Sequence, residues 1–518
     1  MTKILETANT LVWGAPALVL ILGVGLYLSI RTGFIQIRLL PKAAARFWRM
    51  LLPRRSDRAG SSFRALCTAL AATVGTGNLV GVAGAICIGG PGSIFWMWLC
   101  GILGMATKFA EATLAVRYRK RSGGEWLGGP MYIISQAMGP KARPLAWSYC
   151  LFGIFAAFGV GNATQINAVV TGIGTILGGT SRRTDLLIGI TAAAVVGAVV
   201  MGGAKRIGMA AERLVPFAAG GYILLCVFVL AVCHDRLGCA FRAIFLGAFH
   251  PRAVTGGVLG SAFTALRIGC ARGVFTNEAG MGTAAMAHAC ADAEHPVDQG
   301  LMGIMEVFLD TILICTLTAL VILCSGVPIP YGTDAGAELA GLAFSAVCGS
   351  WASGVITAAL ACFALATVLG WGLYGMRCAQ FLFGPGSIKW FLPLQSLALI
   401  LGAVCDTALV WSAAETVNGL MAIPNLIMLA CLSPELSHLA KEYKQKSGDI
   451  AAGGGNYADF HQCKPLRALS HAEVPPAGGC RQEAGQEDLP SEYRPAGSSH
   501  PSGLLRGGAQ IRRAHPGV

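Results

Sequence analysis

The sequence predicts an all-α polytopic membrane protein with about eleven transmembrane helices, a five-plus-five inverted repeat and two discontinuous helices. Three observations predict it. The 518 residues are 54% apolar and only 13% charged, whereas soluble domains carry about 25% charged residues. Apolar blocks long enough to cross a bilayer recur along the chain. Two of these blocks are interrupted by glycines and polar residues.

Each crossing needs roughly 20 apolar residues for about 30 Å of hydrocarbon. Blocks of that kind cover 11–30, 66–86, 93–116, 146–174, 186–203, 211–233, 254–291, 300–325, 351–375, 391–411 and 417–433. They define a transmembrane domain over 1–446. From residue 447 onward Gly, Pro, Ser and Arg dominate, so 447–518 is expected to be a disordered cytoplasmic tail.

The distribution of Lys and Arg predicts the orientation, because cytoplasmic loops carry the excess. The segment 31–64 holds nine basic residues, and the loop after the third span holds six. We therefore expect a multi-pass protein of the cell inner membrane, with its N-terminus outside and its C-terminus cytoplasmic. The net charge of +13 follows from this topology and the basic tail. The bilayer is the expected partner, and neither a nucleic acid nor an organic cofactor is expected.

The second block contains "AATVGTGNLVG", residues 71–81. A helix broken in hydrocarbon leaves backbone groups unpaired, which is tolerable only where protein, ions or a polar ligand supply partners. Close helix packing is the alternative, and Gly77, Gly81 and Ala85 do form a small-residue ladder. Contiguous Gly75, Thr76, Gly77 and Asn78 fit a ladder less well, so we expect the helix to unwind there.

The seventh block, 254–291, is interrupted in the same way by "RGVFTNEAGMG". Ionisable residues at this depth are costly and mark a pathway or a paired site. Two half-helices around a polar turn would accommodate them. The two breaks lie five spans apart, so the repeats about 66–233 and 254–433 would be inverted relative to each other. This pattern is typical of secondary transporters, which bind substrate and ion at the midplane.

The ends of the half-helices can bind the two charged groups of a zwitterion and a cation. An N-terminal end offers free N–H groups to a carboxylate, whereas unwound carbonyls suit Na⁺ or an ammonium group. A channel is the rival class, because broken helices can also line a pore. A chain that carries its own inverted halves favours the transporter. No constellation of nucleophile and base and no phosphate-binding loop is present, so an enzyme is not expected.

Further motifs resemble the alanine or glycine:cation symporter family, the sodium:alanine symporters. The most specific is "GGPGSIFWMWLCGILGMATKFAE" at 89–111, and "GGPMYII", "DTILICTLTALV", "VLGWGLYG" and "NGLMAIPNLIML" agree with it. The resemblance covers about 10–446. It implies a fold similar to the bacterial leucine transporter and Na⁺-driven import of alanine and glycine, with H⁺ coupling in some members. A same-fold transporter of another small amino acid or amine stays open.

The resemblance also implies the site residues. The substrate would be held by Gly75, Thr76, Gly77, Asn78, Asn162, Gln165, Asn277, Gly280, Gly282 and Trp371. The first four would meet its carboxylate, the second break its amino group, and Trp371 would limit its side chain. Gln165 and Asn162 are three residues apart and could share a helix face. The carbonyls of Ala71 and Val74 and the hydroxyl of Thr367 would bind Na⁺.

Two departures from the family pattern and three charge pairs complete the expectations. Ala366 stands where members commonly carry Ser, and "WGLYGMR" replaces Trp-Ser-Tyr-Tyr-Gly-Glu, which leaves ion stoichiometry and substrate preference open. By spacing, Lys108 could pair with Glu111 and Arg272 with Glu278. Glu306 and Asp310 could form a proton or cation relay, or instead lie satisfied at a helix interface.

Overall fold

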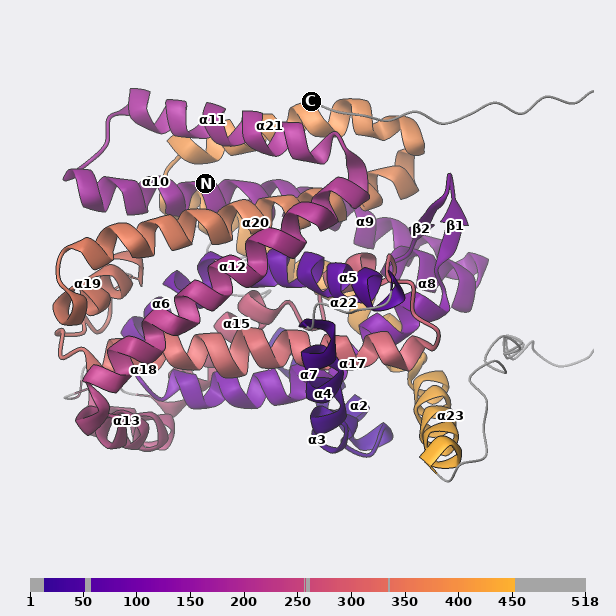
Figure 1. The fold of residues 1–518 in the computed structure, drawn as a ribbon, viewed down its shortest axis with the longest axis horizontal. Coiled ribbons are helices and arrows are strands. Elements are labelled where there is room, and N and C mark those ends of the chain that lie inside the picture. The colour runs from indigo at the N-terminus through magenta and orange to yellow at the C-terminus, as the bar shows by residue number, and fades with distance from the viewer. Residues whose placement is uncertain (1–13, 52–56, 256, 258–260, 334–335, 452–518) are drawn as a thin grey trace, which may run out of the picture. The chain divides into compact units, whose positions relative to one another are not determined.

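The chain is helical almost throughout in the computed structural model, which describes residues 14–51, 57–255, 257, 261–333 and 336–451 (Figure 1). These residues lie in one compact unit, Met1–Ala468, and the second unit, Leu469–Val518, falls outside them. Most of the predicted tail also falls outside them. Its first residues instead continue helix α23, Ser433–Ala451.

Eight helices in the described part of the chain are long and apolar enough to cross a membrane. They are built from α7 (Ser93–Arg117), α9 (Arg143–Phe158) with α10 (Thr164–Leu177), α11 (Arg182–Val200), α12 (Gly203–Val232), α17 (Pro296–Val307) with α18 (Thr316–Cys324), α20 (Trp351–Phe383), α21 (Ile388–Val404) and α22 (Thr407–Cys431). π-helical segments Gly159–Ala163 and Phe308–Cys315 join the two composite helices. The predicted multi-pass, all-α class is confirmed.

Both predicted discontinuous helices are present. Helix α5 (Asp57–Thr73) and helix α6 (Val80–Gly89) form a ninth span, bent by 59° at the break. The seventh predicted span likewise divides into α15 (Ala262–Asn277) and α16 (Thr283–His288). The first predicted span corresponds to α2 (Ala15–Arg31), an apolar helix of 17 described residues that is shorter than the spans counted above. The count of eleven is therefore not confirmed.

The predicted boundary between the last two spans is wrong. The sequence indicated spans at 391–411 and 417–433, but α21 ends at Val404 and α22 begins at Thr407. The chain turns at Cys405 and Asp406. Apolar residues continue on both sides of this two-residue turn, so the hydrophobic pattern contains no signal for it.

Several connections fold into short elements that the sequence analysis did not identify. These are α3 (Ile35–Arg38), α4 (Leu40–Leu51), α8 (Pro130–Ala137), α13 (Leu237–Phe249), α14 (Pro251–Val254), α19 (Gly336–Cys348) and an antiparallel hairpin of β1 (Lys120–Ser122) and β2 (Glu125–Leu127). Local chemistry fixes some of the starts. Ser261 caps α15 by accepting from the Phe263 amide, and His295 caps α17 through the Val297 amide.

The long helices pack in two groups, with the broken helices between them (Figure 1). Helix α7 packs against α15 and α17, whereas α11 packs against α21, and α20 packs against α9 and α10. In its most apolar stretch α7 is 83% buried and α11 only 22% buried. Helix α7 is thus a central helix, and α11 presents most of its apolar surface to lipid.

Candidate functional site

The first break replaces a helical turn by one extended residue and a short 3-10 turn. Gly75 is extended (φ −135°, ψ −152°), and Thr76–Asn78 form the turn. Asn78 folds back over it, and its Oδ1 accepts a 3.0 Å hydrogen bond from the Gly75 amide. A Cβ on Gly75 would lie 2.5 Å from Thr367 Oγ1, so this close approach requires glycine.

The same break frees the carbonyls of Ala71 and Val74, which were predicted to bind Na⁺. The Gly75 amide donates to Asn78 Oδ1, and the Asn78 amide donates to the Gly75 carbonyl. In a continuous helix these two amides would donate to the carbonyls of Ala71 and Val74, four residues earlier. Here both amides donate elsewhere. Thr367 Oγ1 is buried beside the break and has no hydrogen-bond partner among the described residues. These oxygens fit a hard cation, which prefers oxygen ligands.

Gln165 reaches the first break, whereas Asn162 does not. Gln165 Oε1 accepts a long 3.5 Å hydrogen bond from the Thr76 amide. Asn162 instead donates to the Ala157 carbonyl and accepts from Gln395 of α21 at 3.3 Å. The two side chains therefore have separate partners, and the π-helical segment Gly159–Ala163 ends between them.

Glu111 of α7 holds the second break. Its Oε1 accepts from the amides of Gly280 and Gly282, both at 3.0 Å, and from Asn425 Nδ2 at 2.7 Å. Gly280 and Gly282 have φ of +92° and +74°, which glycine adopts without strain. The predicted glycines therefore lie in the break. The Gly280 carbonyl, however, already accepts from Asn425.

Two of the carbonyls that the second break leaves without their helical donors belong to Phe275 and Thr276. The Ala279 amide donates to Asn277 Oδ1 at 2.9 Å, and the Gly280 amide bonds to another helix. Neither amide reaches back to the carbonyl four residues earlier. Asn277 thus lies at the break and shapes it, and the unpaired oxygens lie just before it.

The two breaks face each other through Gly77. A Cβ on Gly77 would lie 3.3 Å from Thr276 Oγ1 and 3.5 Å from the Phe275 ring. A Cβ there would need these side chains at the end of α15 to shift by a few tenths of an ångström. The absence of a side chain at Gly77 therefore lets the two broken helices pack closely.

Asp310 and Thr311 of the second π-helical segment join the breaks through hydrogen bonds. Asn78 Nδ2 donates to Asp310 Oδ1 at 2.7 Å, and Thr311 Oγ1 donates to Asp310 Oδ2 at 2.8 Å. Asn277 Nδ2 then donates to Thr311 Oγ1 at 3.1 Å. Asp310 is fully buried, and no cationic side chain of the described residues lies within ion-pair distance of it.

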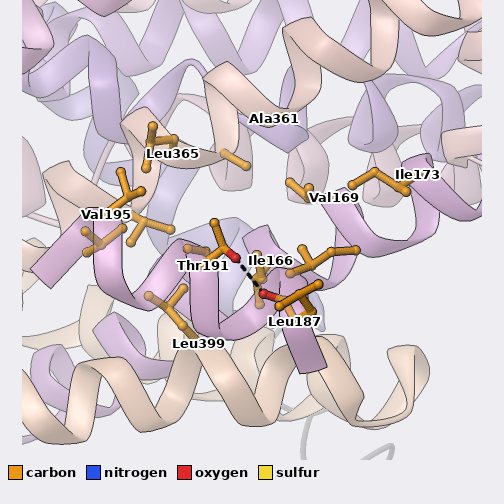
Figure 2. A pocket seen from close by; sticks show the side chains of 14 residues that line it. Ile166, Val169, Ile173, Leu187, Thr191, Val195, Ala361, Leu365 and Leu399 are labelled. Atoms are coloured by element: carbon orange, nitrogen blue, oxygen red, sulfur yellow. Dashed lines mark hydrogen bonds between the residues drawn. The ribbon is translucent and has the colours of Figure 1, made fainter. Parts of the chain in front are cut away.

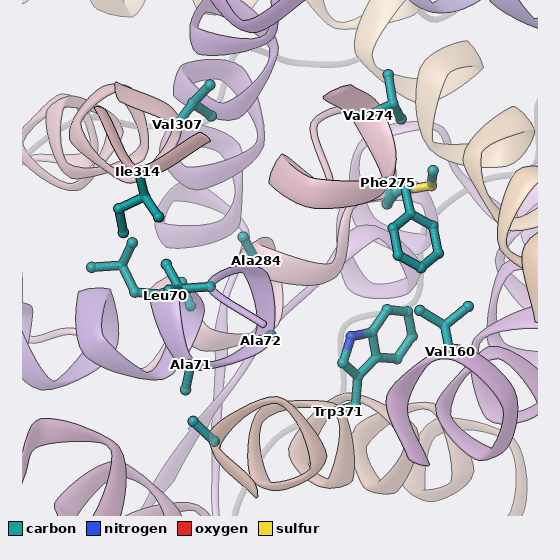
Figure 3. Close-up of a cluster of buried hydrophobic side chains, with 14 of the residues drawn as sticks. Leu70, Ala71, Ala72, Val160, Val274, Phe275, Ala284, Val307, Ile314 and Trp371 are labelled. Carbon is teal, nitrogen blue, oxygen red and sulfur yellow. The ribbon is translucent and has the colours of Figure 1, made fainter. Parts of the chain in front are cut away.

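Trp371 of α20 closes the other side of the breaks (Figure 3). Its indole points toward the Phe275 ring, with Val160 beside them. A Cβ on Gly161 would overlap the Cβ of Trp371, so the helices touch there. The ring is fully buried and packs edge-on against Tyr374, with ring centroids 5.7 Å apart. An aromatic wall of this kind restricts what can lie between α15 and α20.

The expected pair of Lys108 with Glu111 is wrong. Lys108 Nζ lies 2.9 Å from Glu306 Oε1 on α17, and His288 Nε2 lies 2.9 Å from the other Glu306 oxygen. All three side chains are fully buried. Helix α7 packs closely along α17, so Lys108 reaches across to that helix. Glu306 and Asp310, expected as a relay or a helix-interface pair, bind different partners, so the relay stays a prediction.

The expected pair of Arg272 with Glu278 is also wrong. Arg272 Nη1 lies 2.7 Å from Glu415 Oε1 of α22. Glu278 follows the end of α15 in the left-handed region (φ +54°), which turns its side chain away from the helix. It accepts from Trp371 and Thr283 instead.

The buried centre carries more acidic than basic groups. Glu111, Glu278, Glu306 and Asp310 are at most 2% exposed, and Lys108 is the buried lysine beside them. Lys108 interacts electrostatically with the three glutamates. Ionised carboxylates are costly inside a bilayer. Lys108 and His288 both contact Glu306, so a proton or a cation at the other carboxylates would lower the cost of their burial.

A cavity of about 410 Å³ lies between α10, α11, α20 and α21 (Figure 2). Its lining is apolar apart from Thr191, whose hydroxyl donates to the Leu187 carbonyl at 2.8 Å. It offers no free polar group to orient a zwitterion. The breaks, not this cavity, therefore form the candidate site.

The family is decided by comparison with known proteins. The profile of the Sodium:alanine symporter family matches residues 1–452. The chain belongs to the sodium:alanine symporter family. Within that family it is 42% identical to the Sodium/alanine symporter AgcS of Methanococcus maripaludis, over 83% of this chain and 94% of the relative. It is 37% identical to the Probable sodium/glutamine symporter GlnT of Bacillus subtilis, over 85% of this chain and 93% of the relative.

A weaker likeness links this sodium:alanine symporter family member to a crystal structure of MhsT in complex with L-phenylalanine. The identity is 14% and the TM-score 0.49, over 71% of this chain and 88% of MhsT. That likeness is too low to transfer a site. The family and its relatives are transporters, so this chain is a membrane transporter and not an enzyme.

Several residues of this symporter family member that shape the site were missed or misassigned from the sequence. Glu111 and Asn425 hold the second break, and Asp310 and Thr311 join it to the first. Glu111 and Asp310 were visible as carboxylates inside apolar spans, which is itself a functional signal. Their partners lie on other helices, so spacing along one helix could not identify them.

Proposed function

We propose that this transporter imports small neutral amino acids, alanine and glycine, by symport with Na⁺ through alternating access. The observation that carries the proposal is the facing pair of broken helices, whose unpaired backbone groups suit a small zwitterion and a cation. Membership of the sodium:alanine symporter family supports it. So does the likeness to a relative named as a sodium/alanine symporter.

The substrate carboxylate would lie at the first break, against the backbone of Gly75 to Asn78 and the amide of Gln165. Its amino group would lie near the free carbonyls of Phe275 and Thr276, in a break shaped by Asn277, Gly280 and Gly282. Trp371 would limit its side chain. Asn162 would act indirectly, by tying the π-helical segment to α21.

Na⁺ would bind to the carbonyls of Ala71 and Val74 and the hydroxyl of Thr367. The lack of helical partners for these carbonyls supports this assignment. The excess of buried carboxylates supports cation coupling in general, because a cation entering with the substrate would offset their charge. The same excess is the reason to test H⁺ beside Na⁺.

The second candidate is a transporter of the same fold for another small amino acid or amine. Ala366 and the altered "WGLYGMR" segment favour it, as does the likeness to a relative named as a probable sodium/glutamine symporter. For either function we propose the inner membrane as the location, with the N-terminus outside and the C-terminus cytoplasmic.

Uptake into liposomes tests these alternatives. Purified protein is reconstituted, and labelled alanine, glycine and glutamine uptake is measured under an inward Na⁺ gradient, an inward H⁺ gradient and no gradient. Alanine and glycine accumulation driven by Na⁺ is the expected result. Accumulation of glutamine alone would establish the second candidate. Uptake that does not depend on any cation gradient would contradict symport. An uptake rate that rises with substrate concentration without saturating would indicate a channel.

A further inference from the structure

Trp371 is held by one polar contact from the second break. Its Nε1 donates a 2.8 Å hydrogen bond to Glu278 Oε1. Both side chains are buried, Trp371 completely and Glu278 to within 2%. A buried indole N–H that lacked this acceptor would carry an unpaired donor. The bond therefore fixes the direction of a ring that would otherwise be restrained by packing alone.

Glu278 is itself fixed from two sides. It is one of two non-glycine residues with positive φ in the described part of the chain, a conformation that is uncommon outside glycine and clusters at functional sites. Its second oxygen, Oε2, accepts from Thr283 Oγ1 at 2.6 Å. Thr283 is the first residue of α16. One carboxylate thus links the aromatic wall on α20 to the half-helix after the break.

The held ring is the one that faces the end of α15. Figure 3 shows the Trp371 indole directed toward Phe275, with Val160 beside both. The free carbonyl of Phe275 lies at the proposed position of the substrate amino group. The orientation of Trp371 therefore determines how much room the substrate side chain has. Both Glu278 oxygens already accept from protein donors, and one of these donors is the Trp371 indole that faces the proposed position of the substrate.

From this geometry we propose that Glu278 is a positioning residue that sets the size limit for the substrate side chain by holding the Trp371 indole. The inference rests on the proposed amino-acid transport. It adds a second determinant of specificity, located in the break rather than in the pocket wall.

The test is the size profile of inhibition. Uptake of labelled alanine into liposomes is measured with unlabelled alanine, glycine, 2-aminobutyrate and valine as competitors. The proteins compared are wild type, Glu278→Ala, Glu278→Gln, Trp371→Phe and the double variant Glu278→Ala with Trp371→Phe. We expect Glu278→Ala and Trp371→Phe to raise the inhibition by valine relative to alanine by about tenfold, the scale on which a tight pocket discriminates a methylene group. Glu278→Gln keeps an acceptor and should retain most of the wild-type profile. The double variant Glu278→Ala with Trp371→Phe should show the same inhibition profile as either single variant.

Thr316→Val is the matched control. Thr316 Oγ1 accepts from Trp98 Nε1 at 2.8 Å, so this variant removes an acceptor from a different indole, one that packs against Phe241 and Phe245 of α13. It should leave the size profile unchanged. An unchanged profile in Glu278→Ala, or in Trp371→Phe if Glu278→Ala does not fold, would overturn the proposal. If wild type itself did not transport alanine, the proposed function would fail instead, which separates the two outcomes.

Discussion

Asn78 Nδ2 lies 2.7 Å from Asp310 Oδ1, so the side chain that closes the first break is held by a fully buried carboxylate. The other oxygen of Asp310 accepts from Thr311, which in turn is bonded by Asn277 of the second break. The shape of each break thus depends on the same acidic group. A change of charge at Asp310 would therefore reach both halves of the candidate site.

Asp310→Asn should weaken cation coupling while keeping the size of the side chain. Without the charge, the buried centre attracts a cation less strongly. We expect the Na⁺ concentration for half-maximal alanine uptake to rise by about tenfold, which corresponds to about 1.4 kcal/mol. Thr311→Val keeps the charge of Asp310 and should raise this Na⁺ concentration less. Equal Na⁺ and H⁺ dependence in wild type and Asp310→Asn would remove Asp310 from coupling.

Glu111→Gln should destabilise the second break. The amides of Gly280 and Gly282 would lose a charged acceptor, and a carboxamide nitrogen would replace Oε2, which has no partner among the described residues. We expect a loss of about 1–3 kcal/mol in the free energy of unfolding, measured by thermal unfolding in detergent. Glu111→Ala should lose more. Wild-type stability in both variants would contradict this role.

Lys108→Met should be more damaging than the double variant Lys108→Met with Glu306→Gln. The single change leaves Glu306 buried beside His288 without its lysine, and breaking a buried ion pair in this way costs about 3–5 kcal/mol. Neutralising Glu306 removes that penalty. The purified protein is heated and then run on size-exclusion chromatography, and the measurement is the temperature at which its monodisperse peak is lost. A double variant no more stable than the single one would contradict the pairing.

Gly161→Ala should impair transport, whereas Gly220→Ala should not. A Cβ on Gly161 would overlap Trp371, but a Cβ on Gly220 meets nothing within 4 Å. Overpacking of this kind costs about 1–3 kcal/mol. Here it would displace Trp371, which forms one wall of the candidate site. Alanine uptake and thermal unfolding are measured for both. Equal behaviour of the two variants would mean that the contact is not tight.

The two ends of α22 should lie on opposite sides of the membrane. Cys405 and Cys431 flank this helix and are both exposed. With the N-terminus outside and eleven crossings, Cys405 is expected outside and Cys431 inside. Variants that keep one of these cysteines are labelled in whole cells with a membrane-impermeant maleimide. Labelling of Cys431 alone would reverse the proposed orientation.

The sequence predicted the broken helices because glycines and polar residues interrupt two apolar blocks, and such breaks have few tolerable causes in hydrocarbon. It did not predict the turn at Cys405 and Asp406, because a two-residue turn leaves the hydrophobic pattern nearly unchanged. It also did not predict α4, although the apolar and basic residues of this segment recur with helical periodicity, or the hairpin, whose two strands have only three residues each.

Within the candidate site, backbone features were easier to predict than side-chain partners. Gly75 and Gly280 occupy breaks because their conformations or close contacts need glycine. Spacing suggested Glu111 for Lys108, but the true partner, Glu306, comes from a helix almost two hundred residues away. Such partners follow from helix packing, which one sequence does not contain.

Three donors meet at the single oxygen Oε1 of Glu111, and two of them are amides that a continuous helix would use internally. The second break can therefore not rewind into a helix unless Glu111 withdraws. The energy needed to interrupt this helix is met once, during folding, and does not recur with each turnover. A cycle built on such a fixed discontinuity can run on rigid-body movement alone, without the unfavourable nucleation of a new helical turn.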